Sequence, residues 1–452
     1  MQRAFRAAIF HCLDDPGEAG NASACEYLDD GLLVVENGAI TSLGPATAGL
    51  AALRDDAVVV DHSGKLIVPG LIDCHVHYSQ LDIIASYGAQ LLDWLNRYAY
   101  SEELRFADKD HAAGVAEFFL DELLRNGTTT ALVFATVFPQ SVDAIFAAAA
   151  KRNMRLIAGK VLMDRNCPKQ LRDDPQSAYA ESKTLIERWH GRDRLGYAIT
   201  PRFALTSSAE QLEAAGRLAG EFPDTWLHTH LAEDNEEVEE IARLFPHSRS
   251  YLDVYERFGL LRERSVFAHC LYLDAADREL MADKGGAAAF CPTSNLFLGS
   301  GLFDLRSIAA AGIATGLATD VGGGTSLSLL RTMSAAYKVL HLQGQTLPAS
   351  RALYLATLGA ARALRLDDRI GNFAPGKEAD FIVLDARGTA LAARRAAATS
   401  SIEALFFALI FLGDDRHVAA TYLQGDAVSP SNCSGIRSQS RGVRSSAIPG
   451  DQ

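Results

Sequence analysis

The chain has 452 residues, 48% of them hydrophobic and 22% charged, which is the composition of a globular protein with a large buried core. Its 43 Lys and Arg residues against 56 Asp and Glu residues give a formal net charge of −13. A charge of this sign opposes binding to nucleic acid or to an anionic membrane surface, so we expect a soluble enzyme whose partner is a small molecule.

The seven cysteines are scattered and odd in number, and no C-x-x-C spacing occurs among them. Neither a disulfide framework nor a structural thiolate zinc site is therefore expected, and the reducing cytoplasm is the natural compartment. The longest apolar run, at 404–412, is shorter than the roughly 20 residues of a membrane-spanning helix and is interpreted as buried core.

Both ends of the chain contain short strand-like segments separated by Gly, Asp and Asn turn residues. Such segments lie at 5–12, 31–44, 57–70 and 371–385. We expect residues 1–68 and 371–428 to form one small β-sandwich domain. The segment 429–452 is rich in Ser, Gly and Arg and lacks periodicity, so it is expected to be a flexible tail.

Between these ends, strand-like runs alternate with amphipathic helical patterns, such as the one at 111–127, which stops at a glycine. The eight runs lie at 66–77, 128–134, 155–163, 195–200, 225–231, 265–270, 287–292 and 313–320. Eight strand–helix units in about 250 residues are typical of a (β/α)8 TIM-type barrel, so we assign residues 69–370 to this α/β fold. A doubly wound sheet is the alternative, but no G-x-G-x-x-G follows any of the runs.

Metal-binding side chains stand at the ends of four of these runs. The first run ends in His75 and His77, which strand alternation places on one side. His230 ends the fifth run, while His269 and Asp320 end the sixth and eighth. Barrels of this kind place chemistry at the carboxyl ends of their strands, so these side chains are expected to meet. Imidazoles with a carboxylate are ligands for zinc or another borderline metal, and a catalytic site leaves one position open for water.

The remaining histidines are interpreted differently. Seven of them are expected to be surface or packing residues: His11, His62, His111, His190, His247, His341 and His417. His228 shares the strand face of His230 one pleat deeper, and we expect it to lie behind the ligands or in the core.

The motifs PGLIDCHVH, THLAE, FAHC and ATD, in this order, resemble the amidohydrolase superfamily, in its branch of metal-dependent deaminases and chlorohydrolases. Longer segments resemble the guanine deaminase family within that branch. They are HVHYSQ (75–80), GAQLLDWL (88–95), RNGTTTALVF (125–134), ITPRFALTSS (199–208), HTHLAEDNEEV (228–238), FCPTSNLFLGSG (290–301) and GNFAPGKEADFIVLD (371–385). The resemblance runs from about residue 3 to residue 428.

The resemblance implies a metal centre and catalytic residues. The implied ligands of one zinc ion per chain are His75, His77, His230 and Asp320. His269 would lie close to the ion and orient the water or the reacting ring. Glu233 would shuttle protons, and Asp320 would take a proton from the water as it adds, so these two and His269 are the expected catalytic residues.

The implied reaction is the hydrolysis of guanine to xanthine and ammonia in purine catabolism, by a zinc-activated water that adds to the carbon bearing the exocyclic amine. Gln80 and Arg202 would read the polar edge of the purine, with Phe203 packing beside the ring. The other implied substrate contacts are His77, His230, Glu233, His269 and Asp320. The family also implies a cytoplasmic homodimer.

Several alternatives stay open at this point. Two-metal relatives use a carboxylated Lys at the end of the fourth strand, where this chain has none, and Lys160 in the third run is expected to form a salt bridge. The P-C-x-x-C signature of the cytidine deaminase fold is absent. The protein could be a related one-zinc amidohydrolase acting on a triazine or an adenosine derivative, or a non-catalytic metal-binding barrel. The glycines at 322–324 either bind an anion or let the backbone approach a substrate.

Overall fold

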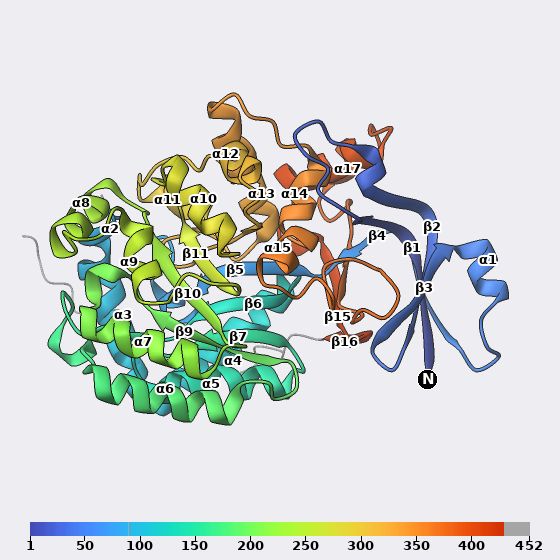
Figure 1. The fold of residues 1–452 in the computed structure, drawn as a ribbon. Helices are drawn as coiled ribbons and strands as arrows, with labels where there is room; N and C mark the ends of the chain where they lie inside the picture. Colours follow the sequence, from blue (N-terminus) through green and yellow to red (C-terminus); the bar gives the residue numbers. More distant parts are fainter. Residues whose placement is uncertain (89, 429–452) are drawn as a thin grey trace, which may run out of the picture.

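A nearly closed barrel of parallel strands and a second sheet beside it organise the chain (Figure 1). The computed structural model describes residues 1–88 and 90–428, so the tail expected at 429–452 lies outside the described residues. The barrel confirms the predicted α/β fold class, and the second sheet is built from both ends of the chain, as expected.

The barrel is a parallel sheet whose strands follow one another in chain order. Its strands are β5 (Leu71–His77), β6 (Thr128–Phe134), β7 (Arg155–Gly159), β9 (Leu195–Pro201), β10 (Trp226–Leu231), β11 (Ser265–His269), β12 (Ala287–Phe290) and β13 (Thr315–Leu317), while β8 (Val161–Leu162) pairs with β9. Two backbone hydrogen bonds bring its ends together: His77 N donates to Val321 O at 2.8 Å, and Asp320 N donates to His75 O at 2.9 Å. The first strand and the segment after the last strand therefore lie side by side.

Helices cover the outside of the barrel (Figure 1). They are α4 (Lys109–Arg125), α5 (Pro139–Lys151), α6 (Pro175–Trp189), α7 (Ala209–Glu221), α8 (Asn235–Leu244), α9 (Tyr251–Arg257), α10 (Ala275–Asp283), α11 (Pro292–Phe297), α12 (Leu305–Ala310), α13 (Leu329–Leu342), α14 (Ala349–Leu355) and α15 (Leu358–Ala363). The helix expected at 111–127 is α4, which begins earlier because Asp108 caps it by accepting from the backbone N–H groups of Asp110 and His111. It stops before Gly127, whose φ of 80° ends the helical path.

The second sheet has the strand order β16-β15-β14-β4-β1-β2-β3. Its strands are β1 (Gln2–Cys12), β2 (Cys25–Glu36), β3 (Ala39–Pro45), β4 (Val58–Pro69), β14 (Phe381–Leu384), β15 (Val418–Leu423) and β16 (Asp426–Val428), with helices α1 (Ala46–Ala51), α16 (Ala390–Ala396) and α17 (Ile402–Leu412) in the same parts of the chain. Neighbouring strands are antiparallel except β1 and β4. In its core, Phe381 stacks on Tyr422 and Phe5 packs edge-on against Phe381. The domain boundaries at 68 and 371 stay predictions.

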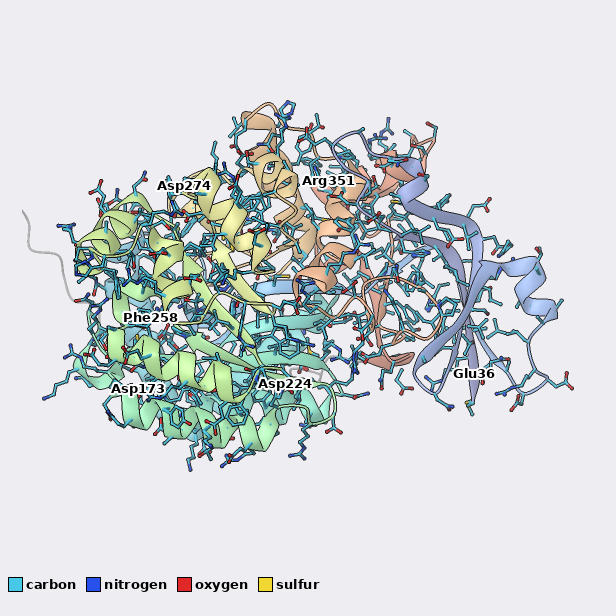
Figure 2. All side chains as sticks on the ribbon, in the orientation of Figure 1. Glu36, Asp173, Asp224, Phe258, Asp274 and Arg351 are labelled. Carbon is cyan, nitrogen blue, oxygen red and sulfur yellow. The ribbon has the colours of Figure 1, made fainter. Side chains whose placement is uncertain are left out.

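The run 66–77 was expected to be a single strand, but the chain divides it between the two sheets. β4 ends at Pro69, and β5 begins at Leu71 in the barrel. A Cβ on Gly70 would lie 2.1 Å from Thr129 Oγ1, so only glycine lets the chain pass β6 at this crossing. Arg351 of α14, labelled in Figure 2, pairs with Asp15 at 3.1 Å and ties the barrel to the loop after β1.

The apolar run at 404–412 lies within α17, and this helix is only partly buried. Phe406, Leu409 and Ile410 are buried, whereas Phe411 is 38% exposed. Among the described residues, no helix is both long enough and apolar enough to cross a membrane.

A further helical stretch follows β5 and leads to α4. It consists of a 3-10 turn (Tyr78–Ile83), α2 (Leu91–Trp94), a π-helical turn (Leu95–Ala99), α3 (Tyr100–Glu103) and a second 3-10 turn (Leu104–Ala107). The π-helical turn makes residues 91–107 one continuous helical path with a local irregularity, a feature that is frequent at functional sites.

Candidate metal centre and substrate pocket

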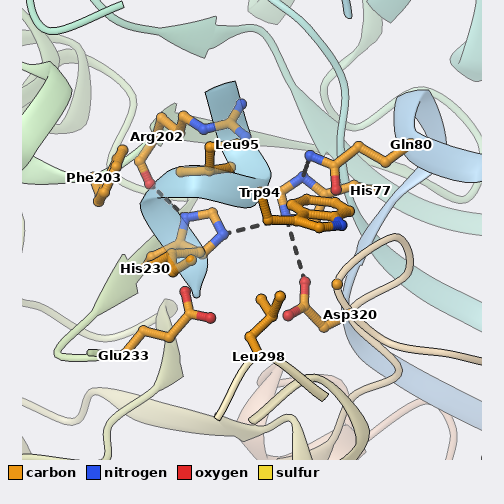
Figure 3. A pocket seen from close by; sticks show the side chains of 12 residues that line it. His77, Gln80, Trp94, Leu95, Arg202, Phe203, His230, Glu233, Leu298 and Asp320 are labelled. Carbon is orange, nitrogen blue, oxygen red and sulfur yellow. Dashed lines mark hydrogen bonds and ion pairs between the residues drawn. The ribbon is translucent and has the colours of Figure 1, made fainter. Parts of the chain in front are cut away.

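Three imidazoles and one carboxylate converge at the carboxyl ends of the barrel strands. His75 and His77 come from β5 and His230 from β10, and all three are buried. His77 Nε2 lies 3.2 Å from both His75 Nε2 and His230 Nε2. Asp320 Oδ1, from the segment after β13, lies 3.1 Å from His75 Nε2 and 3.4 Å from His77 Nε2. The four predicted ligand residues therefore meet at one point, as Figure 3 shows for three of them.

The opposite ring nitrogens of these imidazoles have partners of their own. His75 Nδ1 lies 2.7 Å from His228 Nε2, and His230 Nδ1 donates to the carbonyl oxygen of Arg202 at 2.6 Å. With the proton on Nδ1, the Nε2 lone pairs of His75 and His230 point into the cluster, and such an arrangement calls for a cation. Four tetrahedral ligands at about 2.0–2.1 Å from an ion lie about 3.3 Å apart, which agrees with the spacing found here.

His269 lies at the edge of this cluster. One ligand atom from each of His75, His230, His269 and Asp320 falls within a mutual distance of 4.8 Å. His269 Nε2 is, however, 3.8 Å from Asp320 Oδ2 and closer to Glu233 Oε2, at 3.2 Å. Its Nδ1 is 2.8 Å from Asn295 Oδ1, a contact that the sequence pattern did not indicate. These distances favour His77 over His269 as the third imidazole of the ligand set.

Burial sets the protonation of the cluster. It lowers the pKa values of His77 and His230 well below the usual range and that of His269 to about 4, so these rings are neutral and can bind a metal. Burial also works to raise the pKa of Asp320, but the adjacent His75 outweighs it and keeps that carboxyl ionised.

Glu233 lies in the loop between β10 and α8, with its carboxylate directed into the pocket (Figure 3). Its backbone N–H donates to Glu237 Oε2 at 2.9 Å, and Ser300 Oγ lies 3.5 Å from Glu233 Oε1. Burial, with the charge of Asp320 adding to it, raises the pKa of Glu233 well above its usual value. Glu233 therefore holds a proton under conditions in which Asp320 is ionised.

A pocket opens beside the cluster. Its apolar walls come from Leu91, Trp94, Leu95, Phe203 and Leu298, and its polar lining comes from His77, Gln80, Arg202, His230, Glu233 and Asp320 (Figure 3). All predicted substrate contacts except His269 line this pocket, and His269 Nε2 lies 3.2 Å from Glu233 Oε2, which does line it. Gly323 also lines the pocket, so the backbone of that loop approaches the space available to a substrate.

Arg202 and Gln80 share a buried partner that the sequence analysis missed. Glu103 accepts from Arg202 Nη1 at 2.7 and 2.8 Å, through both carboxylate oxygens. Gln80 Nε2 donates to Glu103 Oε1 at 3.0 Å. The segment around Glu103 carries no motif, and 99 residues separate it from Arg202, so nothing in the local sequence indicated this contact.

His228 and Lys160 lie where the sequence led us to expect them. His228 is fully buried behind His75, with Nδ1 lacking a hydrogen-bond partner within the described residues. Lys160 is buried and forms an ion pair with Asp173 and, at 3.4 Å, with Glu181. Lys160 is therefore committed to carboxylates away from the cluster.

Sequence comparison places the chain among known proteins. A sequence model of the amidohydrolase family matches residues 66–428. The chain is 49% identical over 424 residues to the guanine deaminase of Escherichia coli (strain K12), covering 94% of this chain and 96% of that protein. It is 42% identical over 430 residues to a probable guanine deaminase of Deinococcus radiodurans, covering 94% of this chain and 98% of that protein.

Solved structures give the same result. The structure of E. coli guanine deaminase matches with a TM-score of 0.93 at 48% identity, covering 95% of this chain and 100% of that chain. A guanine deaminase from C. acetobutylicum with bound guanine matches with a TM-score of 0.86 at 26% identity, with the same coverage. A zinc-bound adenosine deaminase from Xanthomonas campestris, at 23% identity and a TM-score of 0.80, shares the fold over 94% of this chain and 92% of its own. The chain therefore belongs to the amidohydrolase family and groups within it with the guanine deaminases.

Proposed function

We propose that the chain hydrolyses guanine to xanthine and ammonia, using one zinc ion held by His75, His77, His230 and Asp320. The observation that carries the proposal is the cluster of three imidazoles and one carboxylate, with spacings of 3.1–3.4 Å, beside the pocket. The relatives that align over nearly the whole chain bear the name of this activity.

Zinc bound by these atoms would supply a Lewis acid that makes a water nucleophilic near neutral pH. The chain's own residues manage the protons. Asp320 is ionised and takes a proton from the attacking water, which adds to C2 of guanine, the carbon that bears the exocyclic amine. Glu233 carries a proton in its buried setting and delivers it to the ring nitrogen next to C2. It then takes up the proton of the new hydroxyl group on C2 and passes it to the amine, which leaves as ammonia. The proton on Asp320 returns to Glu233, so both carboxyl groups end in their starting states.

His269 lies beside this proton transfer. Asn295 holds one side of its ring at 2.8 Å, and its Nε2, 3.2 Å from Glu233 Oε2, is buried with no hydrogen-bond partner among the described residues. The imidazole can therefore orient the water or the reacting ring next to Glu233.

The remaining pocket residues would recognise the flat purine. Trp94, Leu95 and Phe203 supply apolar surface for the ring faces. The Arg202 guanidinium and the Gln80 amide supply polar groups for the edge that bears O6. A buried site whose polar groups are built for one edge rejects analogues that lack the matching atoms, because those groups would be left without partners.

The finer expectations rest on the family. We propose a homodimer in the reducing cytoplasm, and the six described cysteines, which are all free thiols, are compatible with that compartment. Light scattering on the purified protein gives the oligomeric state directly.

The test of the proposed function is product analysis with the purified protein. The protein is incubated with guanine and, separately, with a panel of purines, pterins and triazines, and xanthine and ammonia are quantified together with the metal content. We expect equal amounts of xanthine and ammonia from guanine, one zinc per chain, and a loss of both activity and zinc in Asp320→Asn. A preference for a triazine or an adenosine derivative, or no release of ammonia from any compound, would refute the assignment.

A further inference from the structure

Glu103 lies outside the pocket lining but contacts two of the residues that form it. Its side chain is fully buried and comes from α3. Both of its oxygens accept from Arg202 Nη1, and Oε1 also accepts from Gln80 Nε2. One carboxylate thus connects the two polar groups that face the edge of the substrate.

The charge of Arg202 requires this partner. Arg202 is only 2% exposed, and an unpaired buried guanidinium is strongly unfavourable. Glu103 compensates the charge using Nη1 alone, while Nη2 and Nε make no hydrogen bond to protein within residues 1–88 and 90–428. A buried ion pair of this kind adds little stability compared with apolar residues, so its value lies in fixing the direction of the two remaining donor groups.

The amide of Gln80 is fixed in the same way. Its Nε2 donates to Glu103, and its Oε1 accepts from Gly322 N at 3.3 Å, so these partners determine which end of the amide faces the pocket. The same Nε2 lies 3.4 Å from His77 Nδ1. The contacts therefore run without a gap from Arg202 through Glu103 and Gln80 to a ligand of the metal cluster.

The helical stretch 91–107 places Glu103 and the apolar wall in one rigid unit. Leu95 and Glu103 are eight residues apart, about two helical turns, so they lie on the same side of the stretch. Leu95 lines the pocket and Glu103 reaches Arg202 behind it. Both residues belong to one helical stretch, so a shift of that stretch would move the apolar wall and the carboxylate together.

We propose that Glu103 is a positioning residue for substrate specificity, which orients Arg202 and Gln80 toward the ring oxygen of guanine. This inference rests on the proposed function, because it needs guanine as the substrate. It assigns Glu103 no contact with the reacting atoms.

The test uses Glu103→Gln, which keeps the size of the side chain but removes its charge and turns an acceptor into a donor facing Arg202. Steady-state kinetics with guanine are measured alongside the inhibition constant of 2-aminopurine, which keeps the amine at C2 but lacks the oxygen at C6. We expect the KM for guanine to rise about tenfold or more, with kcat and zinc content changed far less. The inhibition constant of 2-aminopurine should stay nearly unchanged, because that ring offers no oxygen to Arg202.

Two further variants separate positioning from folding. Glu102→Gln is the matched control, since Glu102 is the neighbouring residue but pairs with Arg105 at 2.6 Å and does not line the pocket; its kinetics should equal those of the wild type. Glu103→Asp keeps the charge with a shorter reach, and its KM should lie between those of the wild type and Glu103→Gln. If Glu103→Gln does not fold, Glu103→Asp serves with the same pair of compounds.

The outcomes are distinct. A wild-type KM for guanine in Glu103→Gln overturns the inference, as does an equal rise in the constants for guanine and 2-aminopurine, which would indicate general loosening of the pocket. Loss of zinc in either variant would indicate a structural role. If the wild-type protein releases no xanthine, the proposed function itself fails, and that result is seen before any variant is made.

A separate observation concerns two cysteines in the second sheet. Cys12 of β1 and Cys25 of β2 are directly opposite in the antiparallel register, and their Sγ atoms are 3.5 Å apart. Leu13 N donates to Ala24 O in the next pair, so the cysteine pair is of the non-hydrogen-bonded kind, in which Cα atoms lie about 4.5 Å apart. That separation falls within the range that a disulfide spans.

The surroundings give the two thiols different reactivity. Cys12 is buried, whereas Cys25 is half-buried and can be reached from solvent. Contact with Cys25 and burial raise the pKa of Cys12, while contact with Cys12 lowers the pKa of Cys25. Cys25 is therefore the thiol that ionises first and attacks an oxidant.

The geometry points to a reversible disulfide between Cys12 and Cys25, formed by exchange with a low-molecular-weight disulfide such as oxidised glutathione. The Cys25 thiolate attacks one sulfur of the oxidant, forms a mixed disulfide and releases one thiolate. Cys12, after losing its proton, then attacks Cys25 Sγ and releases the second thiol. The protein loses two protons and two electrons, which reduce the oxidant to two thiols.

The bond would close the loop at 13–24 at its base. This loop carries Asp15 and Glu18, which pair with Arg351 and Arg306 on the barrel side. Closing the loop reduces the freedom of the unfolded chain, so oxidation should raise the thermal midpoint of unfolding.

The test is equilibration of the folded protein in buffers with graded ratios of reduced to oxidised glutathione, followed by intact mass, peptide mapping and thermal unfolding. We expect a mass loss of two hydrogen atoms, a crosslinked peptide containing Cys12 and Cys25, and a higher midpoint that a reductant reverses. Cys25→Ser should show none of these changes, and Cys167→Ser, a half-buried cysteine elsewhere, should show all of them. Failure to form the bond at any ratio, or a bond to another cysteine, would overturn the inference.

Discussion

Replacing Glu233 by glutamine isolates proton transfer from metal binding. Glu233 lies in the loop after β10, three residues beyond His230, and its carboxyl group lies by His269 at 3.2 Å. It makes no contact with the imidazole nitrogens that form the cluster at 3.2 Å from one another. Glutamine keeps the size of the side chain but cannot release a proton to the ring. The variant should therefore keep its fold and its zinc.

The expected loss of rate follows from which group could replace Glu233. Asp320, the other carboxyl group lining the described part of the pocket, is ionised and already accepts a proton from water. General acid–base groups typically contribute about 10²–10⁴ in rate, or roughly 3–5 kcal/mol of barrier. Since Asp320 holds no proton before the water adds, we expect a decrease in kcat toward the upper end of that range, with a smaller change in KM.

Metal analysis and steady-state kinetics on the same preparation decide the matter. Glu236→Gln is a suitable control, because Glu236 is exposed in the first turn of α8 and should leave both zinc and kcat unchanged. Loss of zinc in Glu233→Gln would identify Glu233 as a ligand and refute the assigned role. A kcat within a few-fold of the wild type would show that another group supplies the proton.

Other consequences are testable with standard assays. Arg202→Ala should raise the KM for guanine by about 10–100-fold without loss of zinc, because the substrate oxygen loses its donor, and steady-state kinetics with metal analysis check this. Chelation of zinc should abolish activity and lower the thermal midpoint of unfolding, because the metal-binding nitrogen atoms around His77 would be left facing one another. Added zinc should restore both. Burial raises the pKa of Glu237 to about 7, so between about pH 4.5 and 7 the folded chain binds a proton at this group that the unfolded chain has lost. The free energy of unfolding should therefore fall by about 3 kcal/mol as the pH rises through that window. Denaturant unfolding at both ends of the window should show a weaker pH dependence in Glu237→Gln.

The cluster of imidazoles and carboxylate was predictable because its geometry follows from strand periodicity. His75 and His77 are separated by one residue on a strand, so both face the same side. In a parallel barrel all strand ends meet at one rim, which brings His230 and Asp320 to them across long sequence separations. No information beyond strand order and alternation is needed to place these ligands together.

The path of the chain between the two sheets was not predictable in the same way. The run 66–77 is apolar throughout and reads as one strand, because apolar content alone does not reveal a change of partner. The pair Pro69-Gly70 was a turn signal within the run, but its meaning depends on Thr129 of the adjacent strand, which only the folded chain brings near.

The positioning contacts were beyond sequence reasoning for a related reason. Glu103, Asn295 and His228 act on other site residues through side-chain hydrogen bonds, which have no periodicity or spacing. His228 was recognised as lying behind the ligands because it shares a strand face with His230. Glu103 and Asn295 lie on helices whose position relative to the barrel rim depends on packing.

The cluster and the groups that read the substrate edge depend on different parts of the fold. The metal cluster is held by the backbone of the barrel, so it depends on strands that also form the core of the fold. The groups that read the substrate edge are oriented through Glu103, from a helical stretch that joins β5 to α4 and forms no part of the barrel sheet. Substitutions in residues 91–107 can therefore change which ring is accepted while leaving the ligands in place. Substitutions of His75, His77, His230 or Asp320, by contrast, would disturb the cluster itself.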